Sequence, residues 1–153
     1  MDITKVSRAQ RNLNPGNLRP LARNQKWVGQ ICIDTFPGGP FVKFQTAGLG
    51  FRALMILLRN YYRAHDRNTI EKIINRFAPP EENHVSSYIK AVERNSGISS
   101  KAVINVTAPN IMIALVVAIA RHEAGHIWWQ NSDILSGAIA AGLGEKADIE
   151  PYL

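Results

Sequence analysis

The sequence holds a single cysteine, Cys32, which excludes an internal disulfide bond. Because Cys32 stands between two isoleucines, we expect it to be buried as a small hydrophobic side chain. Long hydrophobic runs are also missing, since the longest covers the ten residues 111–120, about half of what a membrane-spanning helix needs. The first residues lack the apolar stretch of a secretory signal. We therefore expect no transmembrane segment, and delivery by other factors if the protein acts outside the cytoplasm.

Acidic side chains are scarce in the first part of the chain. Residues 1–65 contain ten Lys or Arg and only two acids, Asp2 and Asp34, whereas the rest contains eight Lys or Arg and ten acids. A basic surface attracts polyanions such as nucleic acid, anionic lipid and bacterial cell wall, and charge alone does not choose among them. The sequence has no helix-turn-helix, zinc-finger or RNA-binding signature, which argues against a specific nucleic-acid partner.

Length and composition indicate one domain. With 153 residues, 46% of them hydrophobic, the chain can bury a single core. Within residues 1–153 we distinguish a basic segment rich in Asn, Pro and Gly (1–26), a β-hairpin (27–44) and a helical core (49–143). Turns are predicted in the first segment by Asn14-Pro15-Gly16-Asn17 and in the hairpin by Pro37-Gly38-Gly39-Pro40. The expected fold class is mainly α with a small hairpin.

Helical periodicity and capping residues predict the helices of the core. They cover 49–65, a segment capped by Asn68 with Glu71 and stopped by Pro79-Pro80, a segment from 82 or 83 to 95 ended by Gly97, a segment from Pro109 onward, and 133–143 capped by Ser132. The helix from Pro109 is apolar on every face over 111–120, so we expect it to be buried all round.

The apolar helix leads directly into Arg121-His122-Glu123-Ala124-Gly125-His126. A carboxyl at the exit of a buried helix is disfavoured in its ionised form by the apolar surroundings. A glycosidase needs such a protonated acid to transfer a proton to the leaving oxygen. Glu123 is therefore the candidate catalytic acid. The alternative is a surface ion pair between Glu123 and Arg121 or His126.

The same residues also match a zinc-hydrolase pattern. His122 and His126 are four residues apart with Glu123 after the first, as in H-E-x-x-H, where the two histidines share a metal and the Glu acts as base. A third ligand has to come from elsewhere, and His65, His84, Asp133 and Glu145 are only generic candidates. A zinc-dependent peptidoglycan endopeptidase is therefore the alternative to a glycan-cleaving enzyme that needs no cofactor.

The chain contains an ordered series of short motifs: Asn14-Pro15-Gly16-Asn17-Leu18-Arg19, Trp27-Val28-Gly29-Gln30, Phe41-Val42-Lys43-Phe44, Gly50-Phe51-Arg52-Ala53, Leu58-Arg59-Asn60-Tyr61, Ile73-Ile74-Asn75-Arg76-Phe77-Ala78-Pro79-Pro80, Glu82-Asn83 and Tyr88-Ile89. This series resembles phage and prophage virion lysins, including the cystovirus lysin, over residues 12–97 and more loosely over the fourth helix. The resemblance implies peptidoglycan degradation on a lysozyme-like fold similar to lytic transglycosylases. The cystovirus lysin has also been regarded as an endopeptidase, so the likeness leaves the cleaved bond open.

A second likeness concerns the order of the elements. Asn17, Trp27 to Gly29 and Phe41 to Phe44 look like the Asn-rich Gly turn, Trp-x-Gly and aromatic strand of flagellar and autolysin-type glucosaminidases. In those enzymes the helix with the catalytic Glu precedes the turn, whereas here no Glu precedes it. The resemblance implies a circularly permuted lysozyme-like core, in which the helix ending in Glu123 has moved to the C-terminal side. This hypothesis requires Glu123 to lie near Asn14, Asn17 and Phe44.

The predicted site follows from these motifs. The sequence predicts a muramidase or lytic transglycosylase, in which Glu123 protonates the glycosidic oxygen between N-acetylmuramic acid and N-acetylglucosamine. The predicted substrate-binding residues are Asn14, Asn17, Phe44, Tyr62, Asn83, Tyr88 and His126. For the asparagines the alternative roles are turn formation and helix capping, and for the tyrosines core packing. Asp34 is a possible second carboxylate, and Trp128 and Trp129 could stack on sugars.

The expected partners are peptidoglycan glycan strands and other virion proteins, and the expected location is the virion or the host periplasm and cell wall. A phage structural protein without catalytic activity is the remaining alternative.

Overall fold

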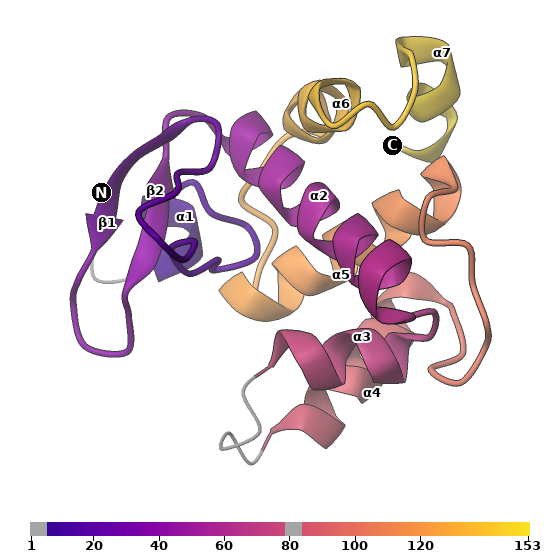
Figure 1. Cartoon of the computed structure of the whole chain (residues 1–153). Coiled ribbons are helices and arrows are strands. Elements are labelled where there is room, and N and C mark those ends of the chain that lie inside the picture. The colour runs from indigo at the N-terminus through magenta and orange to yellow at the C-terminus, as the bar shows by residue number, and fades with distance from the viewer. Residues whose placement is uncertain (1–5, 79–83) are drawn as a thin grey trace.

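The computed structural model describes residues 6–78 and 84–153. Its elements are α1 (Arg8–Arg11), β1 (Gln30–Asp34), β2 (Phe41–Phe44), α2 (Ala47–His65), α3 (Ile70–Phe77), α4 (Val85–Ser96), α5 (Pro109–Ala124), α6 (Asn131–Ala140), α7 (Lys146–Ile149) and the 3-10 helix η2 (Glu150–Tyr152). In Figure 1 the hairpin and α1 lie on one side of the molecule and the longer helices on the other. The architecture is mainly helical with one antiparallel hairpin, as the sequence predicts.

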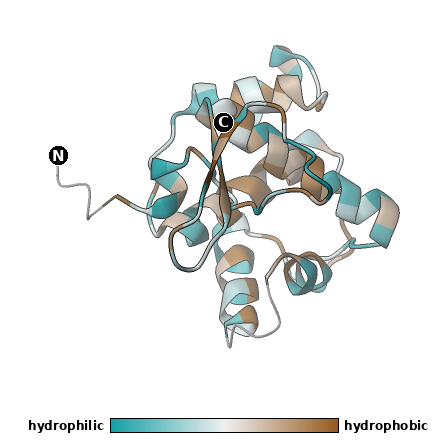
Figure 2. Ribbon diagram, turned by 60° about the vertical axis from the view of Figure 1, so that its left-hand side comes forward, coloured by the Kyte–Doolittle hydropathy of each residue, from teal (hydrophilic) through white to brown (hydrophobic). Residues whose placement is uncertain are grey.

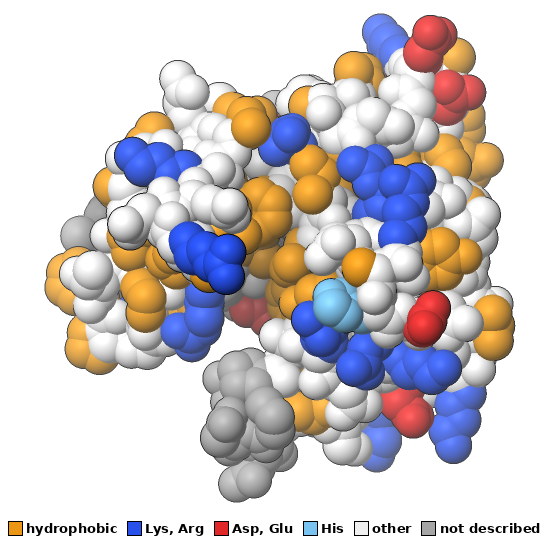
Figure 3. All heavy atoms as spheres, in the orientation of Figure 1, with side chains coloured by type: hydrophobic (Ala, Val, Ile, Leu, Met, Phe, Trp, Pro, Cys, Tyr) orange, Lys and Arg blue, Asp and Glu red, His pale blue; other side chains and the backbone are white. Residues whose placement is uncertain are grey.

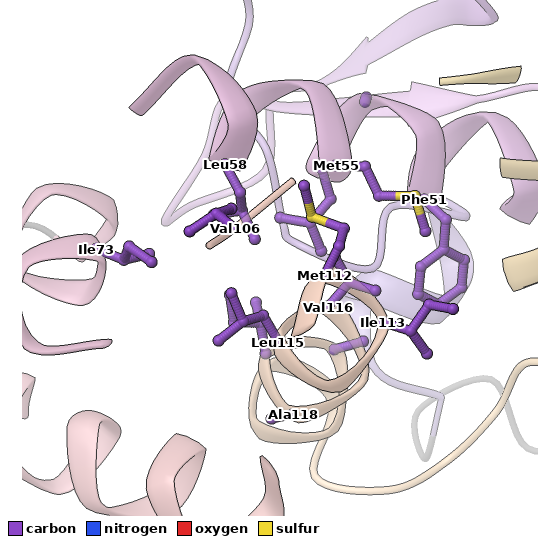
Figure 4. Close-up of a cluster of buried hydrophobic side chains, with 14 of the residues drawn as sticks. Phe51, Met55, Leu58, Ile73, Val106, Met112, Ile113, Leu115, Val116 and Ala118 are labelled. Atoms are coloured by element: carbon purple, nitrogen blue, oxygen red, sulfur yellow. The ribbon is translucent and has the colours of Figure 1, made fainter. Parts of the chain in front are cut away.

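The helix α5 lies at the centre of the core. Elements α1, α2, α4, α7 and η2 all pack against it. Figure 4 shows its Met112, Leu115 and Val116 in one cluster with side chains of α2. Its buried residues are Met112, Ile113, Leu115, Val116, Ala118, Ile119 and Ala120. Burying a large aliphatic side chain stabilises the fold by roughly 1.5–3 kcal/mol. The predicted burial is confirmed for these seven residues, whereas Ile111, Ala114 and Val117 remain partly exposed, so the helix is not buried all round.

The longest helix, α2, crosses α6 at very short range. It begins after Thr46, whose side chain accepts a hydrogen bond from Leu49 N at 3.1 Å. At the crossing, a Cβ atom added to Gly137 would lie only 2.6 Å from the carbonyl oxygen of Gly48. A Cβ added to Gly48 would meet the side chain of Ser136. The two helices can therefore approach this closely only because both positions are glycine.

The hairpin is covered on one face only. Ile33 of β1 pairs with Val42 of β2, and Val42 is fully buried. Cys32, paired with Lys43 on the other face, is exposed. The prediction that Cys32 is buried is therefore wrong, because neighbouring residues of a strand point to opposite faces. Ile31 lies where the register shifts between Gln30 and Cys32, and it is 58% exposed.

Two helix caps differ from the predicted ones. Helix α3 is capped by Thr69, which accepts from Lys72 N at 3.1 Å, and not by Asn68. Helix α6 is capped by Gln130 with Asp133, so it begins before Ser132. Before α3 the sequence offers two capping residues in a row, and Thr69, whose backbone is extended, takes the role. Helix α4 ends at Gly97 as predicted, whereas its predicted start at 82 or 83 falls outside the described residues.

Hydropathy follows the packing. In Figure 2 the hydrophobic stretches of the ribbon lie toward the middle of the molecule, and many outer turns of the helices are hydrophilic. Within residues 6–78 and 84–153, no helix combines the length and the apolar character needed to cross a membrane.

Candidate active site

A cavity of about 470 Å³ opens between the hairpin side and the helical side of the molecule. Residues 16–22, Trp27 and Phe41 line it from the hairpin side, and residues of α2, α3 and α4 line it from the helical side. Glu123, near the end of α5, also lines this cavity. Figure 3 shows the hollow, with hydrophobic side chains along it and Lys or Arg side chains at both edges. Glu123 is the one acid among its described lining residues.

Two neutral donors bind the carboxylate of Glu123. Asn17 donates from Nδ2 to Oε1 at 2.9 Å, and the Tyr88 hydroxyl donates to Oε2 at 2.7 Å. The two donors come from the loop before the hairpin and from α4, so three separate parts of the chain meet at this carboxylate. A carboxylate that accepts one bond on each oxygen is held in a defined orientation. Such an orientation suits an acid that must reach one atom of a bound substrate.

A buried asparagine holds the loop that carries Asn17. Asn14 is fully buried and donates from Nδ2 to the carbonyl oxygens of Leu18, at 3.0 Å, and Val42, at 2.8 Å. Its Oδ1 accepts from Leu18 N at 2.8 Å. All hydrogen-bonding groups of this side chain are thus used within the protein, so the predicted sugar contact of Asn14 is wrong. Asn14 instead fixes the turn in which Asn17 adopts a positive φ of 47°, a conformation that asparagine tolerates.

Aromatic rings hold Tyr88 in place. Its ring lies 3.9 Å from the His122 ring, centroid to centroid, and meets Phe77 edge-on at 6.2 Å. Burial lowers the pKa of His122, and the positive charge of Arg94 lowers it further. A neutral imidazole therefore packs against the Tyr88 ring at neutral pH.

Comparison with known proteins supplies one relative. No family model matches the chain. Protein P5 of Pseudoalteromonas phage PM2 is 34% identical over 116 residues, which make up 74% of this chain and 71% of that protein.

The chain belongs to the family of phage PM2 protein P5. The protein is therefore phage-related, as its resemblance to phage proteins predicts. It fits an association with virions.

In this P5-family chain the structure unites some of the predicted site residues. Glu123, Asn17 and Tyr88 meet in the cavity, although Asn17 and Glu123 are 106 positions apart. Phe44 is fully buried and does not line the cavity, so its predicted substrate contact is wrong. Tyr62 is also not among the described lining residues. Asn83 lies outside the described residues.

The zinc pattern is broken by the end of the helix. Helix α5 ends at Ala124, and Gly125 adopts a positive φ of 79°. His126 therefore does not follow His122 by one helical turn, as a shared metal requires. It is exposed, and its Nε2 lies 3.2 Å from Gln10 Oε1. The described residues contain no group of three His, Cys, Asp or Glu side chains arranged to hold a metal ion.

Asp34 and the tandem tryptophans lie away from the cavity. Asp34 lies 3.5 Å from Arg8 Nε and accepts from Asn12 Nδ2 at 2.9 Å. The bond from Asn12, followed by one from the Phe36 amide, lowers its pKa. It lines a different hollow, so the structure does not place it as a second carboxylate beside Glu123. Trp129 is buried against Phe51, and neither Trp128 nor Trp129 lines the cavity.

Sequence reasoning missed two arginines of the cavity wall, Arg19 and Arg76. Each lies over an aromatic ring distant in sequence: Arg19 over Phe41 at 4.9 Å and Arg76 over Tyr61 at 5.1 Å. No local spacing in the sequence signals such pairs, because they exist only once the hairpin and the helices are packed.

Proposed function

We propose that this chain is a phage lysin that cleaves peptidoglycan between N-acetylmuramic acid and N-acetylglucosamine, with Glu123 as the general acid. The observation that carries the proposal is the carboxyl at the end of a buried helix, oriented in a cavity by Asn17 and Tyr88. The kinship with a phage protein supports an association with virions, and the proposed place of action is the host cell wall or periplasm. The contact between Asn17 and Glu123 supports a permuted lysozyme-like core.

The cleavage begins with a proton transfer. Protonated Glu123 gives its proton to the glycosidic oxygen while the bond from C1 to that oxygen breaks. The carboxylate that forms accepts the hydrogen bonds of Asn17 and Tyr88. Because hydrogen bonds to a charged acceptor are stronger than those to a neutral one, both donors favour the state after proton transfer.

The second half of the reaction uses a group of the substrate. The acetamido carbonyl oxygen bonds to C1 as the leaving sugar departs. Water or the muramyl 6-hydroxyl then attacks C1, the bond to the acetamido oxygen breaks, and the attacking hydroxyl returns a proton to Glu123. Water gives a reducing-end sugar, whereas the 6-hydroxyl gives an anhydro sugar.

Two polar atoms of the cavity residues support an N-acetylated sugar as the ligand. Asn17 Oδ1 and Trp27 Nε1 are buried and have no hydrogen-bond partner among residues 6–78 and 84–153. An unpaired buried polar atom costs roughly 1–3 kcal/mol, which a polar ligand can recover. An acetamido group offers both a carbonyl oxygen for the indole donor and an N–H for the asparagine acceptor.

The test is mass spectrometry of the fragments that the full chain releases from purified peptidoglycan sacculi. We expect wild type to release glycan fragments ending in muramic acid, anhydro or reducing, with stem peptides intact. Glu123→Gln keeps the shape of the side chain but removes its proton, so we expect at least a ~1,000-fold lower rate. The matched control is Glu71→Gln, which alters an exposed glutamate of α3 outside the cavity lining.

Three outcomes contradict this proposal. Cut stem peptides with intact glycan indicate an endopeptidase, and chelator-sensitive cleavage assigns the reaction to a metal. Wild-type turnover by Glu123→Gln removes Glu123 from the mechanism.

A further inference from the structure

The cavity around Glu123 carries one arginine on each of its two sides. Arg19 belongs to the loop on the hairpin side, and Arg76 belongs to the last turn of α3 on the helical side. Both are exposed and both line the cavity. In Figure 3, Lys or Arg side chains flank the hollow on both edges.

Aromatic rings and hydrogen bonds position both guanidinium groups. Arg19 lies 4.9 Å from the Phe41 ring centroid and donates from Nη2 to the carbonyl oxygen of Gly38 at 3.2 Å. Arg76 lies 5.1 Å from the Tyr61 ring centroid, with Nη2 3.2 Å from His65 Nε2. A guanidinium stacked on a ring face still presents its N–H edge to a planar anion. Less conformational freedom is therefore lost when such a group binds a carboxylate.

Neither arginine has an acidic partner within ion-pair distance among residues 6–78 and 84–153. The two ion pairs found there join Arg8 to Asp34 and Lys146 to Glu150. The contrast with Arg8 is informative, because Arg8 also lies over Phe41, at 5.1 Å, but its charge is matched by Asp34. Two positioned arginines in one cavity, neither with an acidic partner in the described part of the chain, indicate a ligand that brings carboxylates.

We propose that Arg19 and Arg76 bind carboxylates of the stem peptides on the peptidoglycan strand that occupies the Glu123 cavity. This inference rests on the proposed function. The glycan backbone itself is uncharged where the lactyl groups are amidated by stems, so the negative charges of the substrate lie on the peptides. Arginine is suited to them because its planar fork matches a carboxylate in a bidentate geometry. The inferred substrate is a stem-bearing glycan, in preference to bare glycan or chitin.

The experiment compares two substrates made from one preparation of Gram-negative sacculi. One half keeps its stems. In the other half an amidase removes the stems, and the lactyl carboxylates that this frees are converted to neutral amides with ammonia and a carbodiimide. We expect Arg19→Gln and Arg76→Gln each to raise KM on stem-bearing sacculi by about tenfold, because each loses a charge-assisted contact. We expect kcat to change less than about twofold, because the contact is remote from the reacting atoms. On stripped glycan both variants should match wild type.

Two further variants sharpen the result. Arg63→Gln is the matched control, since Arg63 is an exposed arginine of α2 that does not line the cavity. Arg76→Lys keeps the charge but loses the planar fork, so we expect only partial recovery. Equal losses on both substrates, or no loss on either, overturn the inference.

A binding measurement separates this inference from the proposed function. Glu123→Gln, alone and combined with Arg76→Gln, is sedimented with each kind of sacculus. If wild type cleaves neither substrate, the proposed function fails. Stem-dependent retention that is lost in the double variant then still supports the inference. Equal retention on sacculi with and without stems overturns the inference. It is also overturned if Arg76→Gln weakens binding to double-stranded DNA but not to sacculi.

Discussion

The two sides of the molecule are held together by different forces. On the helical side, α2 and α5 share a cluster of buried aliphatic and aromatic side chains (Figure 4). On the hairpin side Val42 and Phe44 also join this cluster, but most of the remaining contacts are polar or charged. They are the carboxamide of Asn14, the bond from Asn12 to Asp34, and the arginines over Phe41. The hairpin also leaves Ile31 and Phe36 largely exposed. The carboxyl of Glu123 comes from the helical side, whereas one of its two orienting donors, Asn17, comes from the hairpin side.

This difference predicts that core changes affect the whole protein and that hairpin changes affect the site. A truncation in the apolar cluster removes burial and leaves a cavity, whereas a change in a polar contact shifts the loop that carries Asn17.

The largest effect on stability is expected from Leu115→Ala in α5. Leu115 is 1% exposed, and removing such a side chain typically costs about 2–5 kcal/mol. Chemical denaturation monitored by circular dichroism measures this loss. The control is Val103→Ala, because Val103 is 78% exposed and the expected change stays within about 0.5 kcal/mol. Similar losses for the two variants would remove the contrast between the apolar core and the surface.

The second change tests the polar side. Asn14→Ala leaves the amide of Leu18 and the carbonyl oxygen of Val42 without their partner, so we expect a loss of about 1–3 kcal/mol. The drop in kcat/KM measured where the variant is fully folded should exceed about tenfold, because Asn17 loses its fixed turn. Hydrogen exchange should rise in residues 16–22 and stay unchanged in α5. Asn95→Ala, at an exposed position of α4, serves as the control.

A third change isolates one hydrogen bond. Tyr88→Phe keeps the ring contacts with His122 and Phe77 but removes the hydroxyl that donates to Glu123. We expect kcat to fall by about 10- to 100-fold while the midpoint of thermal unfolding moves by only a few degrees. Tyr152→Phe, at a residue that is 50% exposed, should change neither. If Tyr88→Phe retains full kcat, the hydroxyl serves packing alone.

The smallest expected effect is on the pH dependence of folding stability, which differs between His122 on the helical side and Asp34 on the hairpin side. His122 has a pKa below its ordinary value, so the unfolded chain takes up the proton first and stability falls as pH drops from about 6.5. Asp34 also has a lowered pKa, so its stabilising contribution is lost only at more acidic pH, below about 4. We expect His122→Gln to reduce the fall in melting temperature that occurs as pH drops below about 6.5. Asp34→Asn should alter the melting temperature curve only in its acidic part, where wild type loses the Asp34 contribution below about pH 4.

The sequence predicts the helical side better than the hairpin side for a physical reason. Helical periodicity and the glycine after α4 act over a few neighbouring residues, so α2, α4 and α5 can be predicted locally. The short helices α1 and α7, of four residues each, have no periodicity to detect. The exposure of Cys32 depends on which hairpin face meets the core, and this is a tertiary property.

The candidate site divides in the same way. Glu123 could be predicted because an apolar helix ends beside it, and Asn17 because its turn motif precedes the hairpin. The sequence predicts a ligand contact for Asn14 because sequence alone does not tell a buried carboxamide from an exposed one. Arg19 and Arg76 could not be predicted, since their aromatic partners come from other elements.

Two other segments of the chain pack closely against the first turn of α2, at two glycines that are two residues apart. A methyl group at Gly50 would strike the carbonyl oxygen of Leu13 and the ring of Pro15, just as one at Gly48 would strike α6. The segment that presents Asn17 and helix α6 thus both pack against the same few backbone atoms. A bulkier residue at either position forces one of them outward, so this single helical turn sets the spacing between residues 13–15 and α6.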